Sequence, residues 1–326
     1  MNLILSNIID KYRNHPFGMK LVKVISFIIV ILIFIFVFLK VSDDWSSIHW
    51  DSIQIKYMFI LPALLIAVIS NLLICYIWKR ILCLFRIDMP FLASFRIQLI
   101  SQIGKYIPGK IGLLFTKIIE CNKVGIPNKI SMLSASYEIG LGLYFQLLVG
   151  AVTIPFFLPF FSNSIKTVSI KSFIILIPLG FVFIHPYFFL RFTNLLFKII
   201  NKKSIYMNIK FINWFILILS FLSLAFLNGL LGFFIINMFY TVSFDKIFYI
   251  IGTTSWAFLI GLLNVFAPSG IGVRDGILIG FYSYLIPAPL ALAVAITIRI
   301  LVTSVEWSLI GIAFLIKPEK LKIEGY

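Results

Sequence analysis

The sequence predicts an all-α polytopic membrane protein with about eight transmembrane helices, formed by one integral membrane domain over residues 1–326. The first observation is composition: 61% of the residues are hydrophobic and 12% are charged, whereas about a quarter of the residues in a soluble domain are charged. The second is that the apolar residues form runs of about 20, the length that a helix needs to cross the hydrocarbon core. The third is a pair of Pro/Gly-rich motifs between such runs, which predicts two broken or re-entrant segments.

Seven apolar runs are long enough to be membrane spans. In order they are Leu21–Leu39, Tyr57–Trp78, Ile130–Phe157, Ser172–Leu190, Phe211–Tyr240, Ile247–Phe266 and Pro289–Ile316. Two further segments, Phe91–Val124 and Ala267–Ile286, are too short or too interrupted to be ordinary spans. The first run is long enough to stay in the membrane, so we expect no cleavable signal before it.

The distribution of charge between the runs predicts the orientation. Cations cluster before the first run, after the second run and over residues 191–210, whereas the loop between the first two runs holds Asp43, Asp44 and Asp51. Because cytoplasmic loops are enriched in Lys and Arg, we expect a protein of the inner (cytoplasmic) membrane with the N-terminus inside and the acidic loop outside. These positions agree only if the first interrupted segment enters from the cytoplasm and returns to it. A weaker basic bias at the end of the chain favours a crossing by the second segment and a cytoplasmic C-terminus.

The two interrupted segments share a pattern. Each has a proline followed within four positions by two glycines, and a second proline 19 positions after the first. A broken helix frees backbone groups that hydrocarbon cannot satisfy, so a duplicated break indicates backbone that lines a polar cavity, as at a transport site. The pattern also predicts two repeats, about residues 57–157 and 211–316. The breaks are assigned to Pro108, Gly109, Gly112, Pro268, Gly270 and Gly272.

The first motif nearly matches a nucleotide-binding P-loop. Ile111, however, stands where a magnesium-binding hydroxyl is required, and Pro108 removes a backbone donor from the phosphate cradle. The turn is better suited to a phosphate carried on a lipid, although a solvated loop that only sets the orientation remains an alternative. The cations predicted to bind a lipid headgroup are Lys105, Lys110, Lys117 and Arg274. The scattered cysteines and histidines predict neither a metal site nor a cofactor site.

Three ionisable residues lie within predicted spans: Glu138, Arg299 and Glu306. A charge that faces lipid at the helix centre costs roughly 2.5–3.5 kcal/mol, so we expect these side chains to have partners and to line a polar path. Arg299, Thr303 and Glu306 share one helix face. Glu138 and Arg299 follow the second proline of their motifs by 11 and 12 positions, which predicts that they approach each other, with Glu306 as the alternative partner of Arg299. A buried pair that only fixes helix packing also remains open.

With these residues the chain resembles the lysylphosphatidylglycerol synthase transmembrane family, also called flippase-like membrane proteins. The resemblance covers about residues 10–316 and departs from the family pattern at Ile139, Ser269 and Asp275. It implies broken helices around a central lipid-accessible cavity. In bifunctional members this domain translocates an aminoacylated phospholipid that a separate soluble domain makes, and we expect no such synthase domain here. The matching positions are Gly104-Lys105, Pro108-Gly109, Gly112, Lys117, Glu138, the stretch Pro268–Gly276, and Arg299.

The expected function is therefore non-enzymatic binding or translocation of a phospholipid or lipid-linked glycan intermediate across the cytoplasmic membrane. The net charge of +16 is attributed to cytoplasmic loops beside anionic lipids, not to nucleic acid. One alternative is an accessory membrane subunit of a lipid or polysaccharide biosynthetic assembly. Another is a polyprenyl-phosphate-dependent glycosyltransferase, in which Asp43 and Asp44 would hold a metal in the first external loop.

Overall fold

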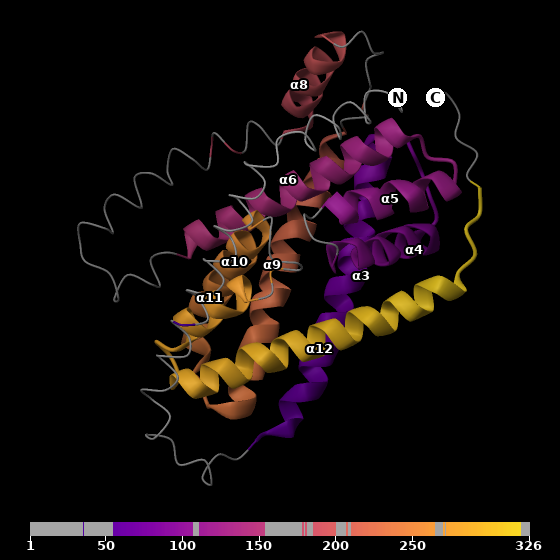
Figure 1. Ribbon diagram of the computed structural model, residues 1–326. Helices are drawn as coiled ribbons and strands as arrows, with labels where there is room; N and C mark the ends of the chain where they lie inside the picture. Colours follow the sequence, from indigo (N-terminus) through magenta and orange to yellow (C-terminus); the bar gives the residue numbers. More distant parts are fainter. Residues whose placement is uncertain are drawn as a thin grey trace.

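The computed structural model describes residues 55–106, 111–153, 185–199, 210–264 and 272–320, together with the single residues 35, 178, 180, 207 and 270. All regular elements in this part of the chain are helices, which confirms the predicted class. Figure 1 shows these helices packed into one bundle, in which the long helix α12 runs from beside α11 at one end to beside α4 at the other.

Five helices in the described part are long and apolar enough to cross a membrane, and they confirm five of the seven predicted runs as helices of sufficient length. The runs Leu21–Leu39 and Ser172–Leu190 lie mostly outside the described residues, so a total of about eight spans stays a prediction. The five helices are α3 (Ile60–Leu84, after the 3-10 turn η2 at Tyr57–Phe59), α6 (Asn128–Val152), α9 (Phe211–Phe239), α10 (Ile247–Leu263, after η5 at Phe244–Lys246) and α12 (Ala288–Leu315).

The second proline of each motif marks the start of a long helix. Pro127 and Pro287 precede α6 and α12 in an extended conformation, and their carbonyls accept the first helical hydrogen bonds, from the amides of Ser131 and Ala291, both at 3.0 Å. Proline lacks a backbone N–H and has a fixed φ, so it is well suited to a helix start, where the first amides have no helical partner.

The first interrupted segment forms a hairpin of two short helices, α4 (Phe91–Gln102, continued by η3 at Ile103–Tyr106) and α5 (Ile111–Lys123), which pack against each other. At 1.5 Å per residue each is about 18–20 Å long, well short of the hydrocarbon thickness of about 30 Å. A Cβ on Gly104 would lie 2.3 Å from the carbonyl oxygen of Gly112, so this crossing of η3 and α5 requires glycine. The hairpin has the form expected of a re-entrant segment.

The second interrupted segment contains α11 (Val273–Tyr282), a helix of 10 residues. Its length of about 15 Å is half of the hydrocarbon core, so α11 alone does not supply the crossing expected from the charge of the C-terminal tail. Gly270 and Gly272 have φ values of +68° and +83°, in the left-handed region that favours glycine. Asp275 then caps the helix, because its Oδ2 accepts a hydrogen bond from the Gly272 amide at 3.1 Å.

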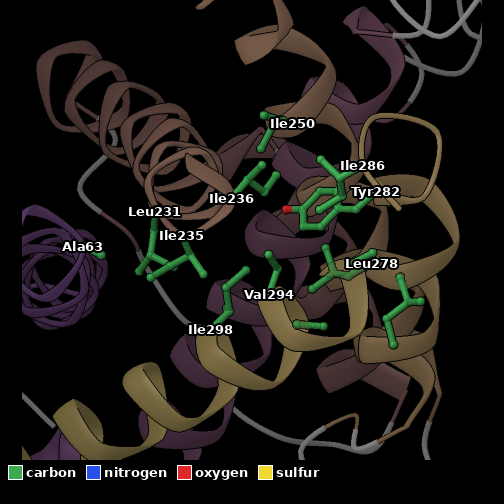
Figure 2. Packing of buried hydrophobic residues seen from close by; sticks show 14 of the residues in the cluster. Ala63, Leu231, Ile235, Ile236, Ile250, Leu278, Tyr282, Ile286, Val294 and Ile298 are labelled. Carbon is green, nitrogen blue, oxygen red and sulfur yellow. The ribbon is translucent and has the colours of Figure 1, made fainter. Parts of the chain in front are cut away.

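The order of elements is the same in both halves: a long helix, a shorter one, the motif, a shorter one and a long one, although of the four shorter helices only α10 with η5 is long enough to span a membrane. In the first half these are α3, α4, α5 and α6, and in the second α9, α10, α11 and α12; the division into two repeats itself stays a prediction. One hydrophobic cluster joins α3 and α9–α12. Figure 2 shows Tyr282 in this cluster with Ile236, Ile250 and Ile286. The Tyr282 hydroxyl lies 3.0 Å from the Thr254 hydroxyl, which satisfies both buried groups.

The helix α8 (Pro186–Ile199) corrects the predicted boundary at Leu190. Arg191 and Lys198 were expected in a loop, but both lie on this helix, which begins at a proline and continues past the end of the apolar run. Figure 1 shows α8 at the margin of the bundle. Its Phe189 ring lies 4.6 Å from the ring of Tyr137 on α6, which attaches α8 to the rest of the fold.

Candidate functional site

A small pocket lies where η3, α11 and α12 meet, so it unites the first interrupted segment, the second and the last long helix. Its cavity volume is about 40 Å³, which is room for a few water molecules and far below the roughly 300–1,000 Å³ of typical ligand sites. The pocket in this structure is therefore too small for a typical ligand. It is lined by Lys105, Arg274, Asp275, Leu278, Ile298, Arg299, Val302, Thr303 and Glu306.

An ion pair between Lys105 and Glu306 closes one side of the pocket. The Lys105 ammonium donates to Oε2 of Glu306, across 201 positions of the sequence, and thereby joins η3 to the middle of α12. Glu306 is 4% exposed, and its other carboxylate oxygen, Oε1, is buried without a hydrogen-bond partner among the described residues. Next to this pair, the rings of Tyr106 and Trp307 stack with centroids 5.7 Å apart.

A second ion pair joins α12 to α11. Arg299 donates from Nε to Oδ1 of Asp275 at 3.0 Å, and its Nη2 lies 2.8 Å from Oδ2 of the same carboxylate. This two-point geometry is the strong form of an Arg–carboxylate contact. It fixes Asp275 from a second direction, since the same carboxylate also caps α11 at Gly272.

Arg274 is the third cation of the pocket. Its guanidinium lies over the Phe258 ring of α10, 5.5 Å from the ring centroid, and in the described part of the chain it forms no ion pair. Gly261 permits this approach, because a Cβ there would lie 3.1 Å from Cβ of Arg274. Three cations against two carboxylates leave the described pocket lining with a net charge of 3 − 2 = +1.

Lys117 and Glu138 lie elsewhere, in a fully enclosed cluster between the hairpin, α3 and α6. Lys117 is 1% exposed, pairs with Oε2 of Glu138, and places its ammonium 3.6 Å from the centroid of the Trp78 ring. Gln98 donates to the other carboxylate oxygen of Glu138 at 2.8 Å. The structure therefore does not bring Lys117 to the pocket with the other predicted headgroup cations, but encloses it where it joins α5 to α6.

The predicted pair between Glu138 and Arg299 is wrong, and so is its alternative between Arg299 and Glu306. Each of these residues has a different partner: Lys117, Asp275 and Lys105 respectively. The reason is packing. The serine- and glutamate-bearing face of α6 is directed at α5, whereas α12 packs against α4 and α11 and is not a neighbour of α6. The spacing from the second proline predicts where a residue lies along its helix. It does not determine which helix packs beside that residue.

Arg96 and its contacts form a third polar cluster, which we did not predict. Nη1 of Arg96 donates to the carbonyls of Ala313 at 3.2 Å and Ile316 at 2.6 Å, and Nη2 lies 3.3 Å from Glu120. A cation that binds the last carbonyls of a helix satisfies groups that have no helical partner and interacts favourably with the helix dipole. Arg96 thus ties the end of α12 to the hairpin.

The structure describes only some of the predicted site residues. Four of these lie outside the described residues: Pro108, Gly109, Lys110 and Pro268. The aspartates predicted to lie in an external loop do as well. Arg299, Thr303 and Glu306, predicted on one helix face, all line the pocket. Asp275 was noted only as a departure from the family signature. The sequence feature that could have identified Asp275 is its position in the first turn of a helix, next to an arginine. Among the described residues no group of three or more His, Cys, Asp or Glu side chains could hold a metal ion.

One known protein family matches most of this chain. The chain matches the lysylphosphatidylglycerol synthase TM region over residues 23–305, which includes both interrupted segments and Arg299. Comparisons with curated proteins and with solved structures gave no significant match. The match spans most of the chain and includes the hairpin, α11 and the first two-thirds of α12. The chain therefore belongs to the lysylphosphatidylglycerol synthase TM region family.

Proposed function

We propose that this protein binds the phosphate-bearing headgroup of a phospholipid or lipid-linked glycan intermediate in the pocket between η3, α11 and α12, and translocates that lipid across the cytoplasmic membrane. The observation that carries the proposal is the convergence of Lys105, Arg274 and Arg299 on one pocket. These cations come from both interrupted segments and from the last long helix, which are far apart in the sequence. Charges grouped inside an apolar bundle are costly, and a phosphate is the ligand that such a group suits.

The ion pairs of the pocket give a chemical path for headgroup binding. A phosphate oxygen can accept the hydrogen bonds that Asp275 and Glu306 accept in the structure, and Arg299 can present two parallel donors to it. Until the phosphate arrives, the carboxylates compensate Arg299 and Lys105, since an unpaired buried charge would cost several kcal/mol. Arg274 forms no ion pair among the described residues and is compensated by Asp275 only at longer range, so we assign it the first contact with the phosphate.

The interrupted helices supply the places where the pocket can open. The two ion pairs of the pocket are contacts between elements, from η3 to α12 and from α11 to α12, so separating them widens the pocket without breaking a helix. The left-handed glycines before α11 provide a turn with few steric restrictions at that point. In this mechanism the protein makes and breaks no covalent bond. It binds and moves the lipid, and the side chains of the described lining bind the charged headgroup and then release it.

A vesicle assay with a fluorescent phospholipid tests this proposal. The purified protein is reconstituted, and the fraction of lipid reachable by a membrane-impermeant quencher is followed over time. Arg274→Gln removes the cation without an ion-pair partner in the described lining. Since a hydrogen bond to a charged group contributes about 1.5–3 kcal/mol, we expect translocation to slow by about tenfold or more. Lys246→Gln is the matched control, because Lys246 is an exposed cation outside the pocket lining that pairs with its neighbour Asp245.

Equal elution and melting of the two variants would show that both are folded. Normal translocation by Arg274→Gln would refute the headgroup role of the pocket, and an inactive wild-type protein would refute translocation itself.

A further inference from the structure

We infer that Asp275 and Glu306 act as a charge filter, so that the pocket selects a phosphodiester, which carries one negative charge, over a phosphomonoester or pyrophosphate, which carry more. The inference deepens the proposed function and rests on it. It concerns the two carboxylates of the pocket rather than its cations, and it gives them a role in choosing the lipid. The role follows from their number, their position in the pocket and the way in which they are held.

The charge balance of the pocket sets the preferred ligand. The described lining has a net charge of +1, from Lys105, Arg274 and Arg299 against the two carboxylates. A phosphodiester brings one negative charge and leaves the described lining neutral. A phosphomonoester carries nearly two negative charges above its second pKa of about 6, so it leaves an excess negative charge in the interior of the bundle, where such a charge has little water to screen it.

The two carboxylates cannot leave when the phosphate arrives. When a phosphate takes the two donors of Arg299, Asp275 stays at the first turn of α11, where its Oδ2 accepts a hydrogen bond from the Gly272 amide. Glu306 lies on the long helix α12 and is 4% exposed. Both carboxylates therefore remain close to a phosphate that Lys105 and Arg299 bind. Their repulsion of the ligand offsets the attraction of the cations in proportion to the ligand's charge, whereas the cost of removing the ligand from water grows faster than its charge.

The size of the effect follows from Coulomb's law. At a separation of about 8 Å and an effective dielectric constant of about 20, removing one carboxylate changes the affinity for a singly charged ligand by roughly thirtyfold. For a doubly charged ligand the change is roughly the square of that factor. The ratio between the two affinities therefore shifts by roughly thirtyfold toward the more charged ligand, and this ratio is insensitive to losses of affinity that the two ligands share.

Calorimetric titration in detergent micelles at pH 8 measures this ratio. The probes are dihexanoyl phosphatidylglycerol, a phosphodiester, and dihexanoyl phosphatidic acid, a phosphomonoester. Dimethyl phosphate and inorganic phosphate are the water-soluble counterparts of the two headgroups, and they show whether the phosphate alone suffices or the acyl chains are needed. The variants are Glu306→Gln and Asp275→Asn, which remove one charge each, and Glu306→Asp, which keeps the charge. Asp245→Asn, at an exposed residue far along the chain from the pocket helices, is the control.

We expect the wild-type protein, Glu306→Asp and Asp245→Asn to prefer the phosphodiester, and both charge-removing variants to shift the ratio toward the phosphomonoester. Asp275→Asn keeps an oxygen that can cap α11, so it tests the filter even if Glu306→Gln does not fold. An unchanged ratio in the folded charge-removing variants would overturn the charge filter while leaving the headgroup site intact. Failure of the wild-type protein to bind either lipid would overturn the site as well.

Discussion

Replacing Glu138 by glutamine is expected to destabilise the protein by about 3 kcal/mol or more, because it leaves a charged lysine enclosed without a counter-charge. Lys117 is 1% exposed and its ammonium contacts only the carboxylate of Glu138 and the face of Trp78 among the described residues. Removing one partner of a buried pair costs about 3–5 kcal/mol. The lower end applies here, since the new amide oxygen can still accept a hydrogen bond from Lys117.

Thermal unfolding in detergent, followed by tryptophan fluorescence, measures this loss. We expect the melting temperature of Glu138→Gln to fall by about 5 °C or more. The double variant Lys117→Met with Glu138→Met removes both charges and should recover most of the loss, because well-packed apolar residues can replace a buried pair at little cost. A melting temperature within 1 °C of the wild-type value, on the order of the assay's resolution, would refute the account of this cluster. So would a double variant that is as unstable as the single one.

Two further substitutions test how the hairpin is built and held. Gly104→Ala places a Cβ 2.3 Å from the Gly112 carbonyl oxygen and should cost about 1–3 kcal/mol. Gly140→Ala, which meets no atom within 4 Å, should be neutral or stabilising in the same melting assay. Equal effects of the two alanines would contradict the close crossing of η3 and α5. Arg96→Met should speed amide hydrogen exchange in the last turn of α12, because its carbonyls lose their cation. Unchanged exchange there would show that this tie is not needed.

The spans could be predicted because hydrophobic length is a local property. The five described long helices match apolar runs to within a few residues at most ends. The shortness of the hairpin helices followed from the breaks in the first motif. The end of α8 could not be predicted, since its residues after Leu190 include cations on an amphipathic helix, which the apolar run does not contain.

The ion pairs could not be predicted, because they depend on which helices meet. Lys105 and Glu306 are 201 positions apart, and no local pattern relates them. The expectation that buried charges have partners was correct, but it did not identify the partners. Lys117 was grouped with the headgroup-binding cations because it follows the first motif, but the structure encloses it away from the pocket. Lys117 lies on the side of α5 that faces α6 and is enclosed there. The buried Glu138, 21 positions later, is its counter-charge.

Photo-crosslinking of a phospholipid that carries a diazirine beside its phosphate tests the central claim most directly. The lipid is activated on the reconstituted protein, and the modified peptides are identified by mass spectrometry. The account predicts that crosslinks concentrate on η3, on the first turn of α11 and around Thr303 on α12, and that Arg274→Gln reduces them. Crosslinks confined to outward-facing positions such as Leu65 and Ile300, which are 54% and 61% exposed, and unaffected by Arg274→Gln, would contradict it.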